Sequence, residues 1–306
     1  MRRSISLPTR AKMLSDIVHK MNKRGKISVR ISSLSKPDHA DASNDGQDGE
    51  PPCATRHART ARRLLSGIAF ATPLNATASA QIPVELYRSV LARAENQSLN
   101  IISIGFLTNI AELLRSGPDS TSSMSGLELV LSRVRELIIM GGQYPSGWEY
   151  NFGGSDPEST QYVLSHWPPS IPVTYSGAEL GGNVFSGQTL KSLAPPDSPV
   201  LAAYEWYAGR GGAIIRESWD PTTTSYGVLG LDGFAKLGLK SPFAYANENG
   251  YNSIILTNGS NAWVNDTTVT NQHWLRLADG VTNSSVAWML DELYVSDPLQ
   301  RACFGY

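Results

Sequence analysis

Three segments of the sequence place polar residues where they could bind a small polar molecule. Residues 105–109 read Gly-Phe-Leu-Thr-Asn, and residues 218–221 read Ser-Trp-Asp-Pro. Between them, Glu149 and Asn151 are two residues apart, so in an extended segment their side chains point to the same side. A carboxylate and a carboxamide placed together suit a polyol, because each binds hydroxyl groups. Asp220 offers a hard oxygen ligand that suits calcium or magnesium.

Each segment also has a purely structural interpretation. Residues 105–109 fit an ordinary strand-to-helix turn, whose free amides suit an anion and whose carbonyls can face a cation. The Asp-Pro of residues 220–221 is typical of a helix start, as is the Asp-Pro of residues 156–157. The loop that follows Met140 is longer than the ~2–6 residues usual for such a connection, which favours a functional loop.

The elements that would position these residues alternate between strands and helices. Helical spacing is seen at residues 86–95, 126–135 and 284–293, and two further helices are expected with Asn109 and Asp156 as N-caps. Short, β-branched apolar runs predict buried strands at residues 101–104, 137–140 and 171–175. This alternation predicts an α/β fold with a mainly parallel central sheet and helices on both faces. Ligands then bind beyond the carboxyl ends of the strands, in the loops after Ile104, Met140 and Tyr175.

The strand–helix alternation does not extend to the two ends of the chain. Residues 252–264 contain Asn-Gly between apolar runs and predict a β-hairpin. Residues 1–66 hold 14 Lys and Arg against 6 Asp and Glu, whereas the rest of the chain holds 12 against 21. We therefore predict a basic, disordered or non-homologous segment at residues 1–66 and one folded domain at residues 67–306. A mitochondrial transit peptide is the alternative for residues 1–36.

Taken together, the motifs resemble the inosine–uridine preferring nucleoside hydrolase family, and in particular a fungal branch of it. The matching segments, over roughly residues 83–295, are Gly-Phe-Leu-Thr-Asn-Ile at 105–110, Ile-Met-Gly-Gly at 139–142, Glu-Tyr-Asn at 149–151, Asp-Pro-Glu at 156–158 and Trp-Asp-Pro at 219–221. The resemblance implies a Rossmann-like fold. It also implies cleavage of the N-glycosidic bond of ribonucleosides to ribose and free base by a calcium-activated water.

The resemblance also implies roles for individual residues. Thr108 would bind calcium through its backbone carbonyl, and Asp220 through its carboxylate. Asn151 would bind the ribose hydroxyls and Glu149 the 5′-hydroxyl side. Met140 would pack on the sugar, and Trp219 would pack near the leaving base. The implied partner is a small-molecule ribonucleoside, and homo-oligomers are usual in the family.

The sequence departs from the family pattern at its beginning. The family opens on a strand that ends in Asp-x-Asp-x-x-x-Asp-Asp, which supplies the catalytic base and most calcium ligands, and residues 1–100 contain no such motif. Asp38, Asp41, Asp45 and Asp48 have neither its spacing nor a preceding strand. We therefore expect the domain at residues 67–306 to lack the first strand of the family. We identify no catalytic base and expect an incomplete calcium site and weak or absent turnover. A ribosyl-binding pseudoenzyme is the alternative.

Composition limits the kinds of partner and the cellular locations to be expected. The net charge of −1 gives no reason to expect nucleic acid as a partner. No apolar run is long enough to span a bilayer, so no membrane partner is expected. Cys53 and Cys303 are isolated and predict two free thiols. Five Asn-x-Ser/Thr sequons are compatible with secretion but do not establish it, and a cytoplasmic location is the default expectation.

Overall fold

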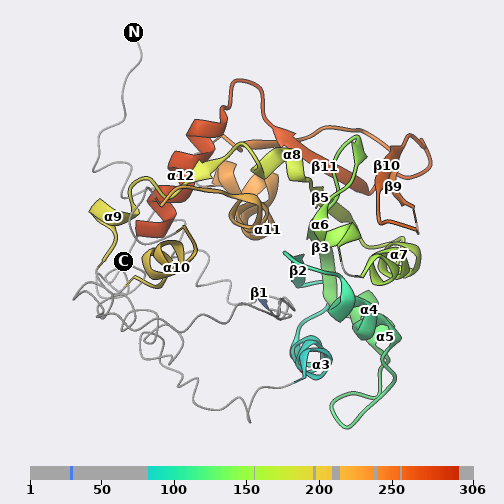
Figure 1. Ribbon diagram of the computed structural model, residues 1–306. Helices are drawn as coiled ribbons and strands as arrows, with labels where there is room; N and C mark the ends of the chain where they lie inside the picture. The colour runs from blue at the N-terminus through green and yellow to red at the C-terminus, as the bar shows by residue number, and fades with distance from the viewer. Residues whose placement is uncertain are drawn as a thin grey trace, which may run out of the picture.

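A six-stranded sheet forms the centre of the molecule (Figure 1). The computed structural model describes residues 28–29, 82–154, 156–195, 198–208, 214–236, 240–255 and 257–295. In sheet order the strands are β1 (Ser28–Val29), β2 (Leu99–Ser103), β3 (Val134–Met140), β5 (Val173–Ser176), β11 (Gln272–Leu277) and β8 (Phe243–Tyr245). Neighbouring strands are parallel from β1 to β11, and only β8 pairs antiparallel within this described sheet. The predicted α/β class with a mainly parallel sheet is confirmed.

Helices cover both faces of this sheet. They are α3 (Pro83–Arg93), α4 (Thr108–Arg115), α5 (Gly126–Arg133), α6 (Tyr150–Gly153), α7 (Pro157–His166), α8 (Ala178–Gly181), α9 (Leu190–Leu193), α10 (Pro199–Ala208), α11 (Trp219–Lys236) and α12 (Asn283–Val295). Ile101 and Leu137 belong to the core beneath α3, α4, α5 and α7, whereas Ile102 and Ile138 pack with α11. Successive strand residues point to opposite faces, so both faces of β2 and β3 are buried.

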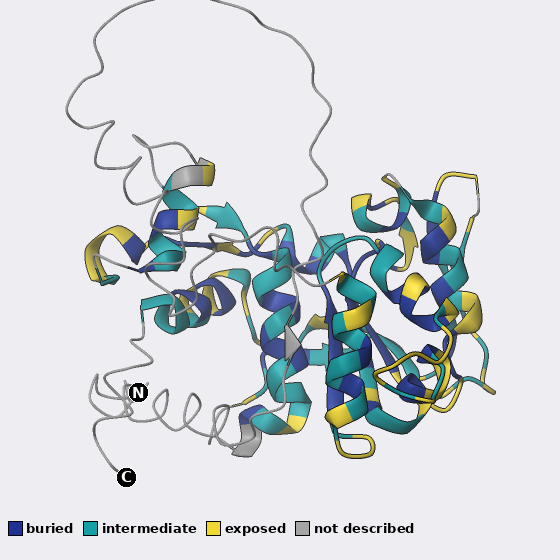
Figure 2. Cartoon of the chain, turned by 90° about the horizontal axis from the view of Figure 1, so that it is seen from below, coloured by how far each residue is buried: buried dark blue, intermediate teal, exposed yellow. Residues whose placement is uncertain are grey.

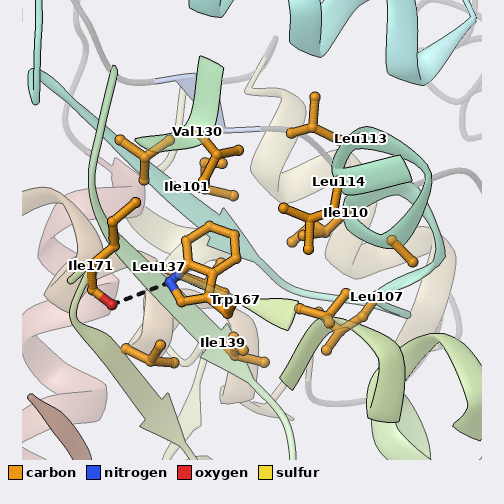
Figure 3. Packing of buried hydrophobic residues seen from close by; sticks show 14 of the residues in the cluster. Ile101, Leu107, Ile110, Leu113, Leu114, Val130, Leu137, Ile139, Trp167 and Ile171 are labelled. Carbon is orange, nitrogen blue, oxygen red and sulfur yellow. Dashed lines mark hydrogen bonds between the residues drawn. The ribbon is translucent and has the colours of Figure 1, made fainter. Parts of the chain in front are cut away.

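The larger core fixes the position of α4 at the carboxyl edge of the sheet. Leu107, Ile110 and Leu113 are almost completely buried against the sheet (Figure 3). Burying one such side chain contributes about 1.5–3 kcal/mol, so the start of α4 is firmly placed. Trp167 lies in the same cluster, and its Nε1 donates to the carbonyl of Ile171 at 3.2 Å. Figure 2 shows this pattern of burial, with the buried residues in the strands and on the inner sides of the helices.

Two local predictions were wrong. Asn109 is not the N-cap of α4, because the helix begins at Thr108 and Leu107 takes the capping position without a side-chain bond. The helix expected at residues 126–135 ends at Arg133, and β3 begins at Val134. Pairing of Val134 with Leu99 of β2 decides this boundary, because tertiary pairing overrides local helical spacing. Asp156 does cap α7, accepting a bond from the amide of Ser159, as predicted.

The predicted hairpin is confirmed, since β9 (Tyr251–Ile254) pairs antiparallel with β10 (Asn261–Val264). The remaining short strands are β4 (Ser146–Gly147), β6 (Phe185–Ser186) and β7 (Arg216–Glu217). None of the described helices is long and apolar enough to cross a membrane.

Only β1 is described within residues 1–66, so the division of the chain into residues 1–66 and 67–306 stays a prediction. The acidic residues between positions 38 and 48 lie outside the described residues, as do both cysteines.

Candidate functional site

The residues predicted to bind a sugar converge where β3 ends. The Asn151 Nδ2 donates to the backbone carbonyl of Met140 at 3.1 Å and lies 3.0 Å from its sulfur. Met140 is buried, and its sulfur is in contact with the amide nitrogen of Asn151. These bonds fix the plane of the carboxamide. Among the contacts of the described residues, its Oδ1 receives no hydrogen bond and can accept one from a hydroxyl.

The prediction that Glu149 and Asn151 lie side by side on an extended segment is wrong. Residues 150–153 form the single turn α6, and Glu149 is its N-cap. The carboxylate accepts hydrogen bonds from the amides of Asn151 at 2.8 Å, Gly142 at 3.1 Å and Phe152 at 3.2 Å. The unpaired amides at a helix start require such an acceptor, which explains the arrangement. Burial raises the pKa of the Glu149 carboxyl, and these amide donors oppose that rise.

Thr108 lies at the start of α4, beside the first turn of α7. Its hydroxyl donates to the Asp156 carboxylate at 2.5 Å, and the same carboxylate accepts from the amide of Ser159 at 3.0 Å. Burial is the largest single effect on Asp156 and raises its pKa, but the bonds from Thr108 and Ser159 together leave that pKa lowered. Asp156 therefore joins the loop after β2 to the segment that follows the loop after β3.

Trp219 and Asp220 are the first residues of α11. Hydrogen bonds through Ala178 of α8 connect Trp219 to Gly142, in the loop after β3. The Trp219 Nε1 donates to the carbonyl of Ala178, and the amide of Ala178 donates to the carbonyl of Gly142, both at 2.9 Å. Burial raises the pKa of Asp220 to about 6, and the positive charge of Arg216 opposes this rise. At neutral pH Asp220 is therefore a mostly ionised carboxylate in a desolvating environment, where a cation or a hydroxyl donor would stabilise it.

Aromatic side chains gather around Tyr150, the residue that precedes Asn151. The rings of Phe106 and Tyr150 are 5.4 Å apart between centroids, and those of Trp148 and Tyr150 are 6.4 Å apart. Tyr150 is 61 % exposed and Trp148 is 48 % exposed, so both present faces to solvent. Rings of this kind can stack on the planar groups of a ligand.

The described residues do not by themselves complete a calcium site. Calcium needs ~6–8 oxygen ligands, several of them charged. Within the described part of the chain, no three His, Cys, Asp or Glu side chains come together where they could hold a metal. Thr108 and Asp220 remain the two predicted calcium ligands among these residues.

The sequence did not reveal that Glu179 and Asn261 hold the loop after β3. The carboxylate of Glu179 accepts from the amide of Tyr144 at 3.1 Å. The side chain of Asn261 bonds both to the amide of Gln143 and to its carbonyl. These contacts join residues 35 and 118 positions apart, so no local spacing in the sequence could have revealed them.

The sequence matches a known family. A family model described as inosine-uridine preferring nucleoside hydrolase matches residues 20–228. The pyrimidine-specific ribonucleoside hydrolase RihB of Shigella flexneri serotype 5b is 26 % identical over 146 residues, which are 46 % of this chain and 39 % of that protein. Its counterpart in Escherichia coli O17:K52:H18 has the same identity and coverage. The matched region thus spans about two fifths of the length of these curated relatives.

The fold is similar to that of a plant nucleoside hydrolase, the PpNRh1 enzyme. The two structures superpose with a TM-score of 0.50 at 16 % sequence identity, over 74 % of this chain and 69 % of the plant chain. At this level of identity the likeness shows a shared fold and nothing finer.

Proposed function

The chain belongs to the inosine-uridine preferring nucleoside hydrolase family, and from this we propose that it binds ribonucleosides at the carboxyl edge of its sheet and hydrolyses their N-glycosidic bond. The observation that carries this proposal is the fixed carboxamide of Asn151, held against Met140 at the end of β3. Ligands of parallel α/β sheets bind at this edge.

The residues of the site have separate roles in binding. Asn151 accepts a hydrogen bond from a ribose hydroxyl through Oδ1 and keeps its Nδ2 on the Met140 carbonyl. Glu149 fixes Asn151 by accepting from its amide, and the second lone pair of Glu149 Oε1 can accept from the 5′ side of the sugar. Trp219, whose indole is held on Ala178, supplies an apolar surface for the leaving base.

In the proposed reaction, the oxygen of a water molecule bonds to C1′ while the bond between C1′ and the base nitrogen breaks. The water loses one proton, and the departing base takes up one. We propose slow turnover, because the 306 residues hold no Asp-x-Asp-x-x-x-Asp-Asp motif to supply a base. A positioned general base contributes roughly 10²- to 10⁴-fold to such a reaction.

Calcium is proposed as a weakly bound activator, with Asp220 and the carbonyl of Thr108 as its ligands from the described residues. When bound, the ion would polarise the attacking water and orient the sugar diol. Calorimetric titration of the chain with calcium tests this point. Sub-micromolar affinity would contradict the weak binding that two ligands imply.

The test of hydrolysis is the release of free base from inosine and from uridine, measured by chromatography with calcium and with a chelator. We expect slow release that rises with calcium and falls in Asn151→Ala, by roughly 30- to 1,000-fold if the sugar contact tightens in the transition state. Glu158→Gln is the matched control, because Glu158 lies exposed on the outside of α7. Base release equal in the unmodified chain and in Asn151→Ala would refute the assignment of the site.

A second candidate function is ribonucleoside binding without hydrolysis. The observation in its favour is the fixed carboxamide of Asn151, because an amide oxygen held in this way can accept from a sugar hydroxyl whether or not a catalytic base is at hand. Saturable binding of inosine or uridine with no base released over days would establish this function. Measurable base release would exclude it.

A further inference from the structure

The loop that joins β3 to α6, residues 141–149, is held in place by the C-terminal hairpin. We call residues 141–149 the substrate loop. Its strand β4 pairs antiparallel with β10, with Gly147 opposite Asn261. The amide of Trp263 on β10 also donates to the carbonyl of Pro145 at 2.7 Å. In Figure 1 the hairpin of β9 and β10 lies beside α7, in agreement with the contacts between β9 and α7. The family match ends at residue 228, so it assigns no role to this hairpin.

Asn261 makes the central contact between the hairpin and the loop. Its Oδ1 accepts from the amide of Gln143 at 2.8 Å, and its Nδ2 donates to the carbonyl of Gln143 at 3.1 Å. The same Nδ2 donates to Asn252 Oδ1 on β9 at 3.0 Å. Asn261 is 2 % exposed, so these bonds are made away from water. A carboxamide is suited to this position, because it offers a donor and an acceptor in one plane.

Gly142 shows how closely the loop is pressed against this side chain. Its φ of +77° is in the left-handed region that favours glycine. A Cβ at this position would lie 2.9 Å from the Tyr144 hydroxyl and 3.1 Å from Asn261 Oδ1. The turn at residues 142–143 is therefore shaped by contact with the hairpin as well as by its own sequence.

A continuous series of bonds leads from the hairpin to the sugar site. Asn261 holds Gln143, and the preceding amide, that of Gly142, donates to Glu149 Oε2. The other oxygen of Glu149 accepts from the amide of Asn151. We propose that Asn261 is a positioning residue for the nucleoside site, through which the C-terminal hairpin holds the substrate loop in its binding conformation. This inference rests on the proposed function for the identity of the ligand.

Asn261→Asp tests the proposal. The substitution keeps the size of the side chain and its acceptor, but it replaces the donor by an oxygen facing the Gln143 carbonyl and Asn252 Oδ1. Asn265→Asp is the matched control, because the same change is made at an exposed position just after β10. If Asn261→Asp does not fold, Asn252→Ala replaces it, since this variant removes the side-chain acceptor that supports Asn261 and leaves the bonds between Asn261 and Gln143 intact.

Two readouts are compared in each full-length variant: hydrogen exchange of the amides of residues 142–149, and the affinity for inosine and uridine. Loss of two hydrogen bonds should speed exchange in the loop by roughly 10-fold or more and weaken nucleoside affinity by roughly 3- to 10-fold. Exchange in β3 should stay unchanged, and Asn265→Asp should alter neither readout.

The outcomes separate the two proposals. If the unmodified chain binds neither nucleoside, the proposed function fails, and this inference loses the ligand on which it rests. If the unmodified chain binds a nucleoside and Asn261→Asp binds it equally well, the positioning role is overturned while the proposed function stands. Faster exchange throughout the sheet would also overturn it, by showing a general structural role instead.

Discussion

Asp220→Asn should make the protein more stable at neutral pH, although Asp220 is a predicted ligand of the site. Burial raises the pKa of this carboxyl from 3.8 to about 6, so the folded state favours the protonated form. The stabilisation of that form is fully present below pH 3.8 and is lost as the pH rises through 6. Asparagine cannot ionise, so the variant avoids this loss.

The size of the effect follows from the same pKa values. Across the whole titration the shift corresponds to about 3 kcal/mol, as an upper bound for a partly buried group. Between pH 5 and pH 8 the loss is about 1.4 kcal/mol, because at pH 5 the unfolded chain is already mostly ionised at this position. The difference in unfolding free energy between Asp220→Asn and the unmodified protein should grow by that amount over this range.

Urea denaturation at several pH values, followed by circular dichroism, measures this difference. Asp232→Asn is the matched control, because Asp232 is an exposed residue of α11 that lies beyond the kink at Gly230. A stability difference that stays constant from pH 5 to pH 8, or one that shrinks, would show that Asp220 is not a desolvated carboxylate.

Three further substitutions test the framework around the site. Arg88→Met removes a guanidinium that is 2 % exposed and bonded to Asp119, and it should lower the unfolding free energy in urea by about 2 to 3 kcal/mol. Ser125→Ala removes the capping box of α5 and should cost about 1 kcal/mol in the same assay, so an unchanged midpoint would argue against the cap. Thr108→Val removes the hydroxyl that donates to Asp156, and the pKa of Asp156 measured by NMR should rise, whereas an unchanged value would exclude this bond.

The sequence predicts the fold well where the signals are local. The Asp156 cap and the β9–β10 hairpin were expected correctly, because a cap and a hairpin both depend on residues close together in the sequence. Asn109 was wrongly expected as a cap. The helix begins earlier in the chain, at Thr108, directly after Leu107, which is buried against the sheet. Local propensity cannot outweigh packing of this kind.

The candidate site was predictable only in part, for a related reason. Met140, Glu149 and Asn151 do come together, but the carboxylate of Glu149 is directed at backbone amides of its own loop. The role of Asn261 depends on contact with Gln143, 118 residues earlier in the chain. Bonds between segments this distant arise from the tertiary fold and have no periodic signature in one sequence.

Asn151 is proposed to bind a ribose hydroxyl at the carboxyl edge of the sheet. The most direct measurement is a calorimetric comparison of inosine with 2′-deoxyinosine and 3′-deoxyinosine, using the unmodified chain and Asn151→Ala. Removing one of these hydroxyls should weaken binding to the unmodified chain by roughly 3- to 10-fold, and Asn151→Ala should abolish this difference. Equal affinity of the unmodified chain for all three nucleosides, or a difference that persists in Asn151→Ala, would contradict it.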